Sequence, residues 1–452
     1  MKKVTCTILF LTALSCWAQH PAVSTVTPEQ KVYELSLIWR EMSYNFDNMN
    51  NCMDLDADSL YRAFLPIVSH TANDFEYTKS IMRYLACFKN SHTFVVDSPS
   101  WTDSLSQLYI RTEYRKGKVF LTNFSKKYAD KMHIWDEIVS INGIPAVKFM
   151  LEEFYPYVPA TNDEYRILTA MSNKGPWTMF PYGTTFQLIL KGEKEYSIAL
   201  PAEKMIGEPS EWFVQDFNIN RKNGWYMDSK SQTGYLRIVE CSSEAKDFFL
   251  GKLDSIRSCE TIILDLTHNT GGTSTNTEDI SGFLAKTESF TTDSVLSKMN
   301  IAYMKAVSSY SCDESSDPDN DLCKMKRGEY FYALPPTEYA NSYYPSNFKG
   351  KVIILQGSET GSAAEWLISK LKQDKSIVSY GGKTMGATGN PFHLVLPSGL
   401  HIQFNTWRTF DFTGTETSMG INPDVEIDFS ECYKTDDIRE LYHNIVKAIQ
   451  KR

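Results

Sequence analysis

The stretch KVIILQGSETGSAAEWL, residues 351–367, joins an apolar run to a segment with helical spacing. Residues 352–355 are apolar without alternation, which is typical of a strand covered on both faces of a parallel sheet. The pattern that follows predicts a helix, with Ser362 at or just before its N-terminus. Small residues flank this serine and leave space around its hydroxyl: Gly361, Ala363 and Ala364. A second apolar run, TIILDL at 261–266, has the same character, so an α/β core is expected.

The rest of the chain divides by the period of its apolar residues. Helical spacing predicts an N-terminal helical domain at 24–98, and a change to a period of two predicts a β-rich domain at 104–202. Strands that alternate with helices place the α/β core at 206–432, and 434–452 is expected to form a C-terminal helix. A Tyr- and Ser-rich insertion at 287–348 interrupts the core and is more typical of a lid or binding element than of a linker. A chain of 452 residues is expected to have several such domains.

The first residues resemble an export signal. Residues 1–18 combine two lysines, a short apolar stretch and small residues before a cut after Ala18, so a signal peptide is predicted. A lipoprotein acylated at Cys16 is the alternative. Either reading indicates export to the bacterial periplasm or cell envelope. No other segment is long and apolar enough to span a bilayer, and the net charge of −9 argues against nucleic acid as a partner.

The cysteines and acidic residues indicate neither a disulfide framework nor a metal site. The chain has nine cysteines, two of them in the leader, and the odd remainder is too small for a framework. Cys312 and Cys323 bracket an acidic loop and are the pair expected to bridge in an oxidising compartment. The aspartates of this loop lack the glycine and the distal glutamate of a calcium-binding loop. We therefore expect a solvated acidic loop, no metal and no cofactor.

Two strand ends carry residues suited to acyl transfer. If the loop after 261–266 lies beside Ser362, backbone amides of Gly271 or Gly272 and of Ala363 would form an oxyanion hole. A serine hydroxyl needs a base, and His92 in KNSHT, at the end of the helical domain, is the candidate. Taken singly, the serine would be only an N-cap and the histidine an ordinary surface or interior residue.

Eight segments, in order, resemble the C-terminal processing (tail-specific) serine peptidases, in their tricorn-like branch. They are SHT, DEIVSINGIPA, GYLRI, IILDLTHNTGG, KVIILQGSETGSAAEWL, YGGKTMGATG, LVLPSGLHI and GINPDVEI, which together extend over roughly residues 28 to 430. The resemblance implies that Ser362, within T-x-S-A-A-E, is the nucleophile and that the glycine pair supplies oxyanion amides. It also implies crotonase- or ClpP-like ββα units in the core, and a PDZ-like domain at 104–202 that holds a substrate tail by strand addition.

The same resemblance favours histidine over lysine as the base. Serine–lysine members carry a lysine directly after T-x-G, where this chain has Ala387. Tricorn-like members use a histidine preceded by a serine, which matches Ser91 and His92. In those members a glutamate near the G-I-x-P-D segment hydrogen-bonds to that serine. Glu416 is the nearest acid here, with Asp411 as a poorer substitute.

The sequence thus predicts an exported serine endopeptidase that cleaves proteins or peptides through an acyl-enzyme. His92 would take the Ser362 proton, and Ser91 with Glu416 would fix the imidazole. Homo-oligomeric assembly is compatible with the sequence, which specifies no subunit number. One alternative is a catalytically silent peptidase-fold protein that binds peptides or small apolar ligands, although that role would not require the serine, histidine and glycine pair together. Crotonase-type acyl-CoA chemistry is another, against which the export signal argues.

Overall fold

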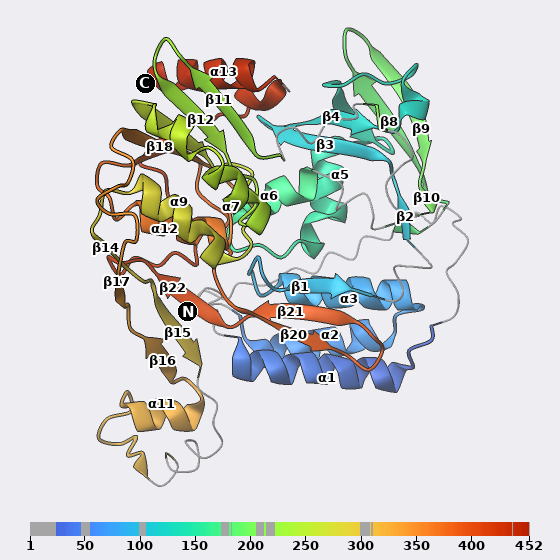
Figure 1. Ribbon diagram of the computed structural model, residues 1–452. Coiled ribbons are helices and arrows are strands. Elements are labelled where there is room, and N and C mark those ends of the chain that lie inside the picture. The colour runs from blue at the N-terminus through green and yellow to red at the C-terminus, as the bar shows by residue number, and fades with distance from the viewer. Residues whose placement is uncertain are drawn as a thin grey trace.

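The computed structural model describes residues 24–46, 55–98, 105–172, 180–181, 183–204, 212–213, 222–298, 308, 311–435 and 437–451. The predicted leader and Cys16 lie outside these residues. In the part of the chain that is described, no helix combines the length and apolar character needed to cross a membrane. Three hydrophobic units and a projecting arm make up the molecule (Figure 1).

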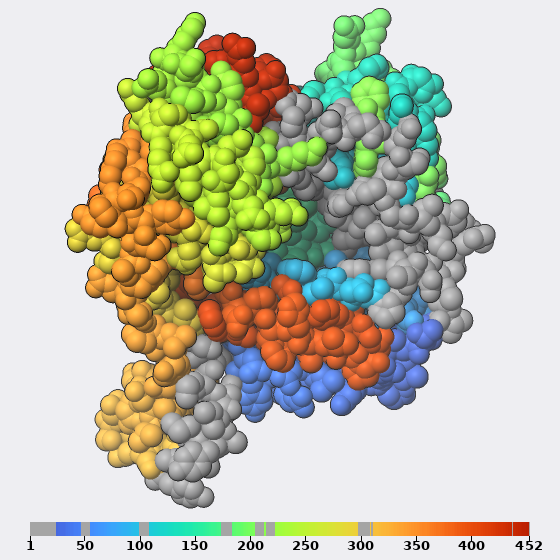
Figure 2. Space-filling view, in the orientation of Figure 1, coloured from blue at the N-terminus to red at the C-terminus, as the bar shows by residue number. Residues whose placement is uncertain are grey.

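The N-terminal unit is built around three helices. It consists of α1 (Pro28–Asn45), α2 (Ala57–Ser69) and α3 (Asp74–Ala86), whose N-caps are Thr27, Asp56 and Asn73. A three-stranded antiparallel sheet packs on these helices, in the order β1 (Phe94–Asp97), β21 (His401–Asn405) and β20 (Pro391–Val395). Ile402 and Phe404 of β21 are fully buried in the same apolar cluster as the helices. A hairpin from late in the chain therefore completes the N-terminal core, and Figure 2 shows it in orange across the blue helices.

The second unit is β-rich and has its own core. Its main sheet follows the order β3 (Ile110–Arg115), β4 (Lys118–Phe124), β5 (Glu137–Ile141), β8 (Thr185–Lys191) and β9 (Glu195–Pro201), with β6 (Ile144–Pro145) beside β5. Two helices accompany it, α5 (Ala146–Glu153) and α6 (Asp163–Met171). A small sheet adjoins it: β10 (Glu203–Lys204), β2 (Leu105–Gln107) and β7 (Phe180–Pro181). β3 is an edge strand of the main sheet.

The third unit is the predicted α/β core. Its sheet has the order β11 (Gly224–Asp228), β12 (Thr233–Arg237), β13 (Thr261–Asp265), β18 (Lys351–Gln356), β19 (Val378–Gly381) and β23 (Val425–Glu426), and all but β11 run parallel. Four helices pack on one face: α7 (Ser243–Leu250), α8 (Leu253–Arg257), α9 (Glu278–Leu284) and α12 (Ala363–Leu371).

The opposite face of this sheet is covered by α13 (Ile438–Gln450), the predicted C-terminal helix. Ile262 and Leu264 point to one apolar cluster, and Ile263 between them points to the other. This two-sided burial explains why the strand sequences do not alternate.

The insertion forms an arm with strands of its own. β14 (Ser289–Thr291) pairs with β17 (Glu338–Ala340), and β15 (Ser294–Lys298) lies between β16 (Phe331–Leu334) and β22 (Trp407–Phe410). At its tip, α11 (Asp321–Arg327) belongs to a lobe that stands off from the body (Figure 1). The predicted Cys312–Cys323 disulfide is present there and is confirmed.

Candidate active site

Ser362 lies at the N-cap of α12, in a turn with a strained backbone. Its φ is 53° and its ψ is −123°. A positive φ is uncommon for any residue other than glycine, and such strain persists only where the surrounding structure holds it. The backbone N–H of Ser362 donates a hydrogen bond of 3.0 Å to Glu365 Oε2, which fixes the turn from the helix side.

The glycine loop after β13 lies directly against this turn. Gly271 has a φ of 105°, and a Cβ built on it would stand 2.5 Å from Ser362 Cβ and 3.0 Å from Ala363 N. Gly272 has a φ of 136°, and its Cβ would stand 2.7 Å from Cys241 O. The two strand ends are therefore side by side, and only glycine permits so close an approach.

Two backbone donors in this contact are unpaired. Gly271 N–H is already used, because it donates to Asn269 Oδ1 at 2.9 Å. Within the described ranges, the N–H groups of Gly272 and Ala363 have no hydrogen-bond partner. Of the amides considered for the oxyanion hole, Gly272 and Ala363 are thus the available pair.

A buried glutamate that the sequence analysis missed holds the site together. Glu365 is 1% exposed and accepts hydrogen bonds from Ser362 N at 3.0 Å, Gly386 N at 2.8 Å, Ala387 N at 2.9 Å and Thr384 Oγ1 at 2.5 Å. Burial raises the pKa of Glu365 to about 7, against the lowering effect of these four donors. The S-x-x-E spacing of a capping box was the signal that could have identified it.

His92 lies just before β1 and is held by its backbone. Its N–H donates to Asn90 Oδ1 at 2.9 Å, and its carbonyl accepts from Gln403 Nε2 of β21 at 3.1 Å. The ring Nδ1 is buried and has no hydrogen-bond partner among the described residues. Burial lowers the pKa of His92 to about 4, so the imidazole is neutral near pH 7, as a general base must be.

Ser91 connects the histidine segment to the turn that Glu365 holds. Its Oγ lies 3.1 Å from Thr161 Oγ1 and accepts from Thr161 N at 3.1 Å. Thr161 Oγ1 in turn donates to Gly386 O at 2.7 Å. A continuous path of contacts therefore runs from His92 through the β-rich unit and the 384–387 turn to Glu365 and Ser362.

Glu416 is engaged elsewhere. Its carboxylate binds Arg408, with Nε to Oε1 at 3.1 Å and Nη2 to Oε2 at 2.6 Å, and accepts from Ser418 Oγ at 2.5 Å. Although burial raises its pKa, Arg408 and Ser418 lower it below the ordinary value. Among the described residues, Ser91 hydrogen-bonds to Thr161 and not to Glu416. The expected hydrogen bond between Ser91 and Glu416 is therefore not formed. Glu416 binds Arg408 of the neighbouring strand β22 instead.

Comparison with known proteins agrees with this fold. Residues 232–427 match the model of peptidase family S41. Mature CPAF superimposes with a TM-score of 0.70 at 11% identity, over 94% of this chain and 97% of that one. Mature CPAF complexed with lactacystin gives 0.69 at 13% identity, over 94% and 98% of the two chains.

A third solved structure, a putative peptidase from Parabacteroides merdae ATCC 43184, gives a TM-score of 0.50 at 16% identity, over 94% of this chain and 96% of that one. Likeness at these identities shows the fold, and the comparison with curated proteins found no match. The matched domain contains Ser362, the glycine loop and the parallel sheet that positions them. Residues 232–427 thus match peptidase family S41, and this match supports a serine peptidase hydrolase.

Proposed function

We propose that the chain is an endopeptidase in which Ser362 is the nucleophile and His92 the general base. The observation that carries this proposal is the strained Ser362 turn, packed on Gly271 with two unpaired amides beside it. A serine that served only as a helix cap would need neither the positive φ nor the glycine that faces it.

The proposed reaction is acyl transfer in two halves. His92 takes the proton from Ser362 Oγ, and Oγ attacks the carbonyl carbon of the scissile peptide bond. The N–H groups of Gly272 and Ala363 stabilise the oxyanion, at about 3 kcal/mol for each donor. The imidazolium then protonates the leaving amine. In the second half, water attacks the acyl-enzyme with His92 again as base, which releases the carboxylic acid product and restores the serine hydroxyl.

The supporting residues differ from those that the family resemblance implies. Ser91 and Thr161 would position the His92 segment, while Glu365 would hold the Ser362 turn and the 384–387 turn together. Glu416 would instead brace β22 through Arg408. Each of these residues acts through another residue and is a positioning residue rather than a catalytic one.

The wider proposal concerns export and substrate capture. Residues 1–18 are proposed as a signal peptide that directs the protein to the periplasm or cell envelope, which sequencing the N-terminus of the secreted protein would test. The unit at 104–202 is proposed as a PDZ-like domain in which the edge strand β3 would pair with a substrate tail. Tyr114 N on that edge donates to Ser172 Oγ at 3.0 Å, so a substrate tail that pairs with β3 would replace this bond.

A serine-reactive fluorophosphonate probe and a fluorescent casein substrate test the catalytic proposal. Labelling is expected for the wild type and lost in Ser362→Ala, and the control Ser346→Ala, which changes an exposed serine, should label normally. Casein cleavage should fall at least a thousandfold in Ser362→Ala and His92→Ala but not in His133→Ala, which changes an exposed histidine.

Full activity in either catalytic variant would refute the assignment of that residue. A correctly folded wild type that neither labels nor cleaves would favour the silent binding protein. Because mature CPAF has been crystallised with lactacystin, competition between lactacystin and the probe provides a second readout at Ser362.

A further inference from the structure

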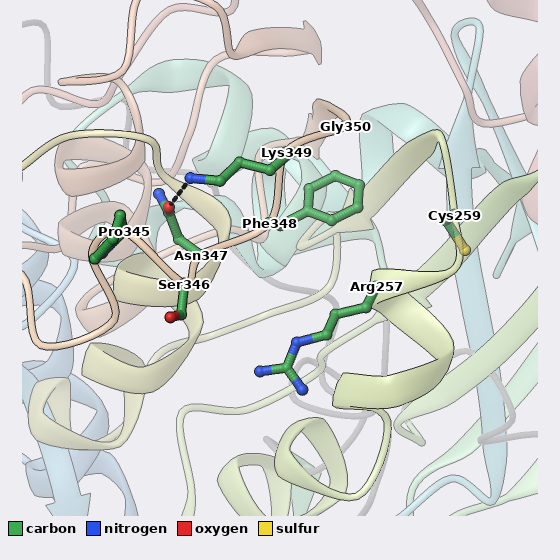
Figure 3. A pocket seen from close by; sticks show the side chains of 8 residues that line it. All are labelled: Arg257, Cys259, Pro345, Ser346, Asn347, Phe348, Lys349 and Gly350. Carbon is green, nitrogen blue, oxygen red and sulfur yellow. Dashed lines mark hydrogen bonds between the residues drawn. The ribbon is translucent and has the colours of Figure 1, made fainter.

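A cavity of about 350 Å³ lies at the amino ends of β13 and β18, and two cations line it (Figure 3). Both cations are already paired. Figure 3 shows Lys349 turned toward Asn347, whose Oδ1 accepts from Lys349 Nζ at 2.6 Å. Arg257 Nη1 lies 3.2 Å from Asp254 Oδ1. This cavity therefore presents no unpaired charge to a ligand, and a better site lies on the surface of the N-terminal unit.

Two histidines meet on the hairpin of β20 and β21. The register pairs His401 with Val395, two residues after His393 on the other strand, so the histidines are diagonal neighbours on one face of the sheet. Leu394 and Ile402, which alternate with them, belong to the apolar cluster on the helices. The histidines therefore face away from that cluster, and their contact is exposed to solvent.

The two imidazole rings are in direct contact. His393 Nδ1 lies 3.0 Å from His401 Nε2, with the ring centroids 5.1 Å apart and the ring planes at 47°. A hydrogen bond between two neutral imidazoles places one proton between the facing nitrogens. If that ring carries its proton on the other nitrogen instead, two lone pairs become available on the shared side.

The distance between the facing nitrogens fits a shared metal ion. An imidazole nitrogen binds a divalent metal ion such as Zn²⁺ at about 2.0–2.1 Å. Two such nitrogens stand about 2.8–3.0 Å apart when they subtend 90° at the ion, and about 3.3–3.4 Å apart at the tetrahedral angle. The observed 3.0 Å matches the 90° arrangement, which is typical of Cu²⁺ and Ni²⁺.

The hairpin is fixed in place by the helices beneath it. At its turn, Ser398 N–H donates to Glu34 Oε1 at 2.7 Å and Ser398 Oγ donates to Oε2 at 2.8 Å. Leu396 and Leu400, on either side of the turn, are 2% and 1% exposed. A backbone held in this way loses little conformational freedom when an ion binds. The exposed His393 ring needs only to rotate about its side-chain bonds to direct its lone pair at the ion.

We propose that His393 and His401 bind one divalent transition-metal ion that favours 90° angles, such as Ni²⁺ or Cu²⁺, on the outer face of this hairpin. Imidazole suits these ions, whereas Mg²⁺ prefers oxygen ligands. The described residues contain no cluster of three or more side chains that could hold a metal ion, so water completes the coordination.

The proposed site uses no residue of the candidate active site but shares a strand with its support. Gln403 lies directly opposite His393, and its Nε2 donates to His92 O at 3.1 Å. An ion that ties β20 to β21 would therefore stabilise the sheet that holds the His92 segment.

Calorimetric titration of the untagged full-length chain with NiCl₂ at pH 7.5 tests the site, because metal ions bind the neutral imidazole. We expect saturable binding by the wild type and at least tenfold weaker binding by both His393→Asn and His401→Asn, since one remaining imidazole cannot chelate the ion. His70→Asn, which changes an exposed histidine at the end of α2, is the matched control and should bind like the wild type. MgCl₂ should give no heat of binding that depends on the histidine pair.

Thermal unfolding gives a second readout. NiCl₂ should raise the unfolding midpoint of the wild type and of His70→Asn but not of the two hairpin variants, because the ion binds only the folded hairpin. Both measurements report ion binding and not turnover, so their outcome does not depend on the catalytic proposal. The proposal is overturned if the wild type does not bind Ni²⁺ saturably, if either hairpin variant binds it as tightly as His70→Asn, or if the midpoint shift persists in those variants.

Discussion

Replacing Glu365 by glutamine should separate stability from activity at the Ser362 turn. The carboxylate accepts four hydrogen bonds, three of them from backbone N–H groups. A glutamine oxygen in the place of Oε2 keeps the bonds from Ser362 N and Ala387 N, and its NH₂ can donate to Thr384 Oγ1. Gly386 N–H then faces another donor and is left buried without a partner, at a cost of about 1–3 kcal/mol.

The pH dependence of this cost has a definite sign. Because the folded-state pKa of Glu365 is about 7 and a free glutamate has a pKa of about 4.3, the folded protein holds this proton more tightly than the unfolded chain. The stability from this group is complete below about pH 4 and is lost as the pH rises through 7, by roughly 3 to 4 kcal/mol in total. Glutamine does not titrate, so Glu365→Gln lacks this loss.

Urea unfolding of both proteins at pH 5 and pH 8.5 measures the effect. At pH 5 the variant should be less stable than the wild type by about 1–3 kcal/mol, and at pH 8.5 it should equal or exceed the wild type. Peptidase activity at pH 8.5 should nevertheless fall at least tenfold, because the hydrogen bond that anchors Gly386 is lost. If the stability gap between wild type and variant widens as the pH rises, the ionised carboxylate stabilises the fold and this reasoning is refuted.

Three further predictions concern other parts of the site and its support. Gly271→Ala should reduce activity at least a hundredfold in a casein assay, because its Cβ would stand 2.5 Å from Ser362 Cβ; activity within threefold of wild type would contradict the close contact. Glu34→Ala should lower the free energy of unfolding by about 2–4 kcal/mol, since buried Glu34 accepts from Tyr77 Oη at 2.5 Å and from Ser398 N at 2.7 Å, and a urea titration measures this. On the acid side of a pH profile, kcat/KM should decrease only as the pH falls through about 4 to 5, because burial lowers the pKa of His92 to about 4. A decrease already centred near pH 6.5 would show that the imidazole is exposed instead.

The parallel sheet and the serine turn could be predicted because each depends on local sequence. The apolar runs at 261–266 and 351–355 form β13 and β18, covered on both faces, and Ser362 does precede a helix. The Cys312–Cys323 bridge closes a short loop of separation 11, which also makes it a local feature.

What could not be predicted depends on contacts between segments distant in sequence. Nothing in the hairpin β20–β21 indicates that it packs on the N-terminal helices, because its apolar face would suit any covering layer. Likewise, the spacing of Glu416 from the G-I-x-P-D segment does not reveal that Arg408 lies opposite it across a strand pair. Thr161 lies in a loop of the β-rich unit and has no motif of its own.

The residues of the candidate site come from all three hydrophobic units. Ser362 and Glu365 come from the core, His92 follows the N-terminal helices, and Thr161 belongs to the β-rich unit. The 384–387 turn is the part that contacts the others, through Glu365 on one side and Thr161 on the other. Because each unit has an apolar cluster of its own, the contacts between units should open at lower free energy than the units unfold. Loss of the proposed catalytic geometry should therefore precede unfolding, because the histidine and the serine are held by different cores.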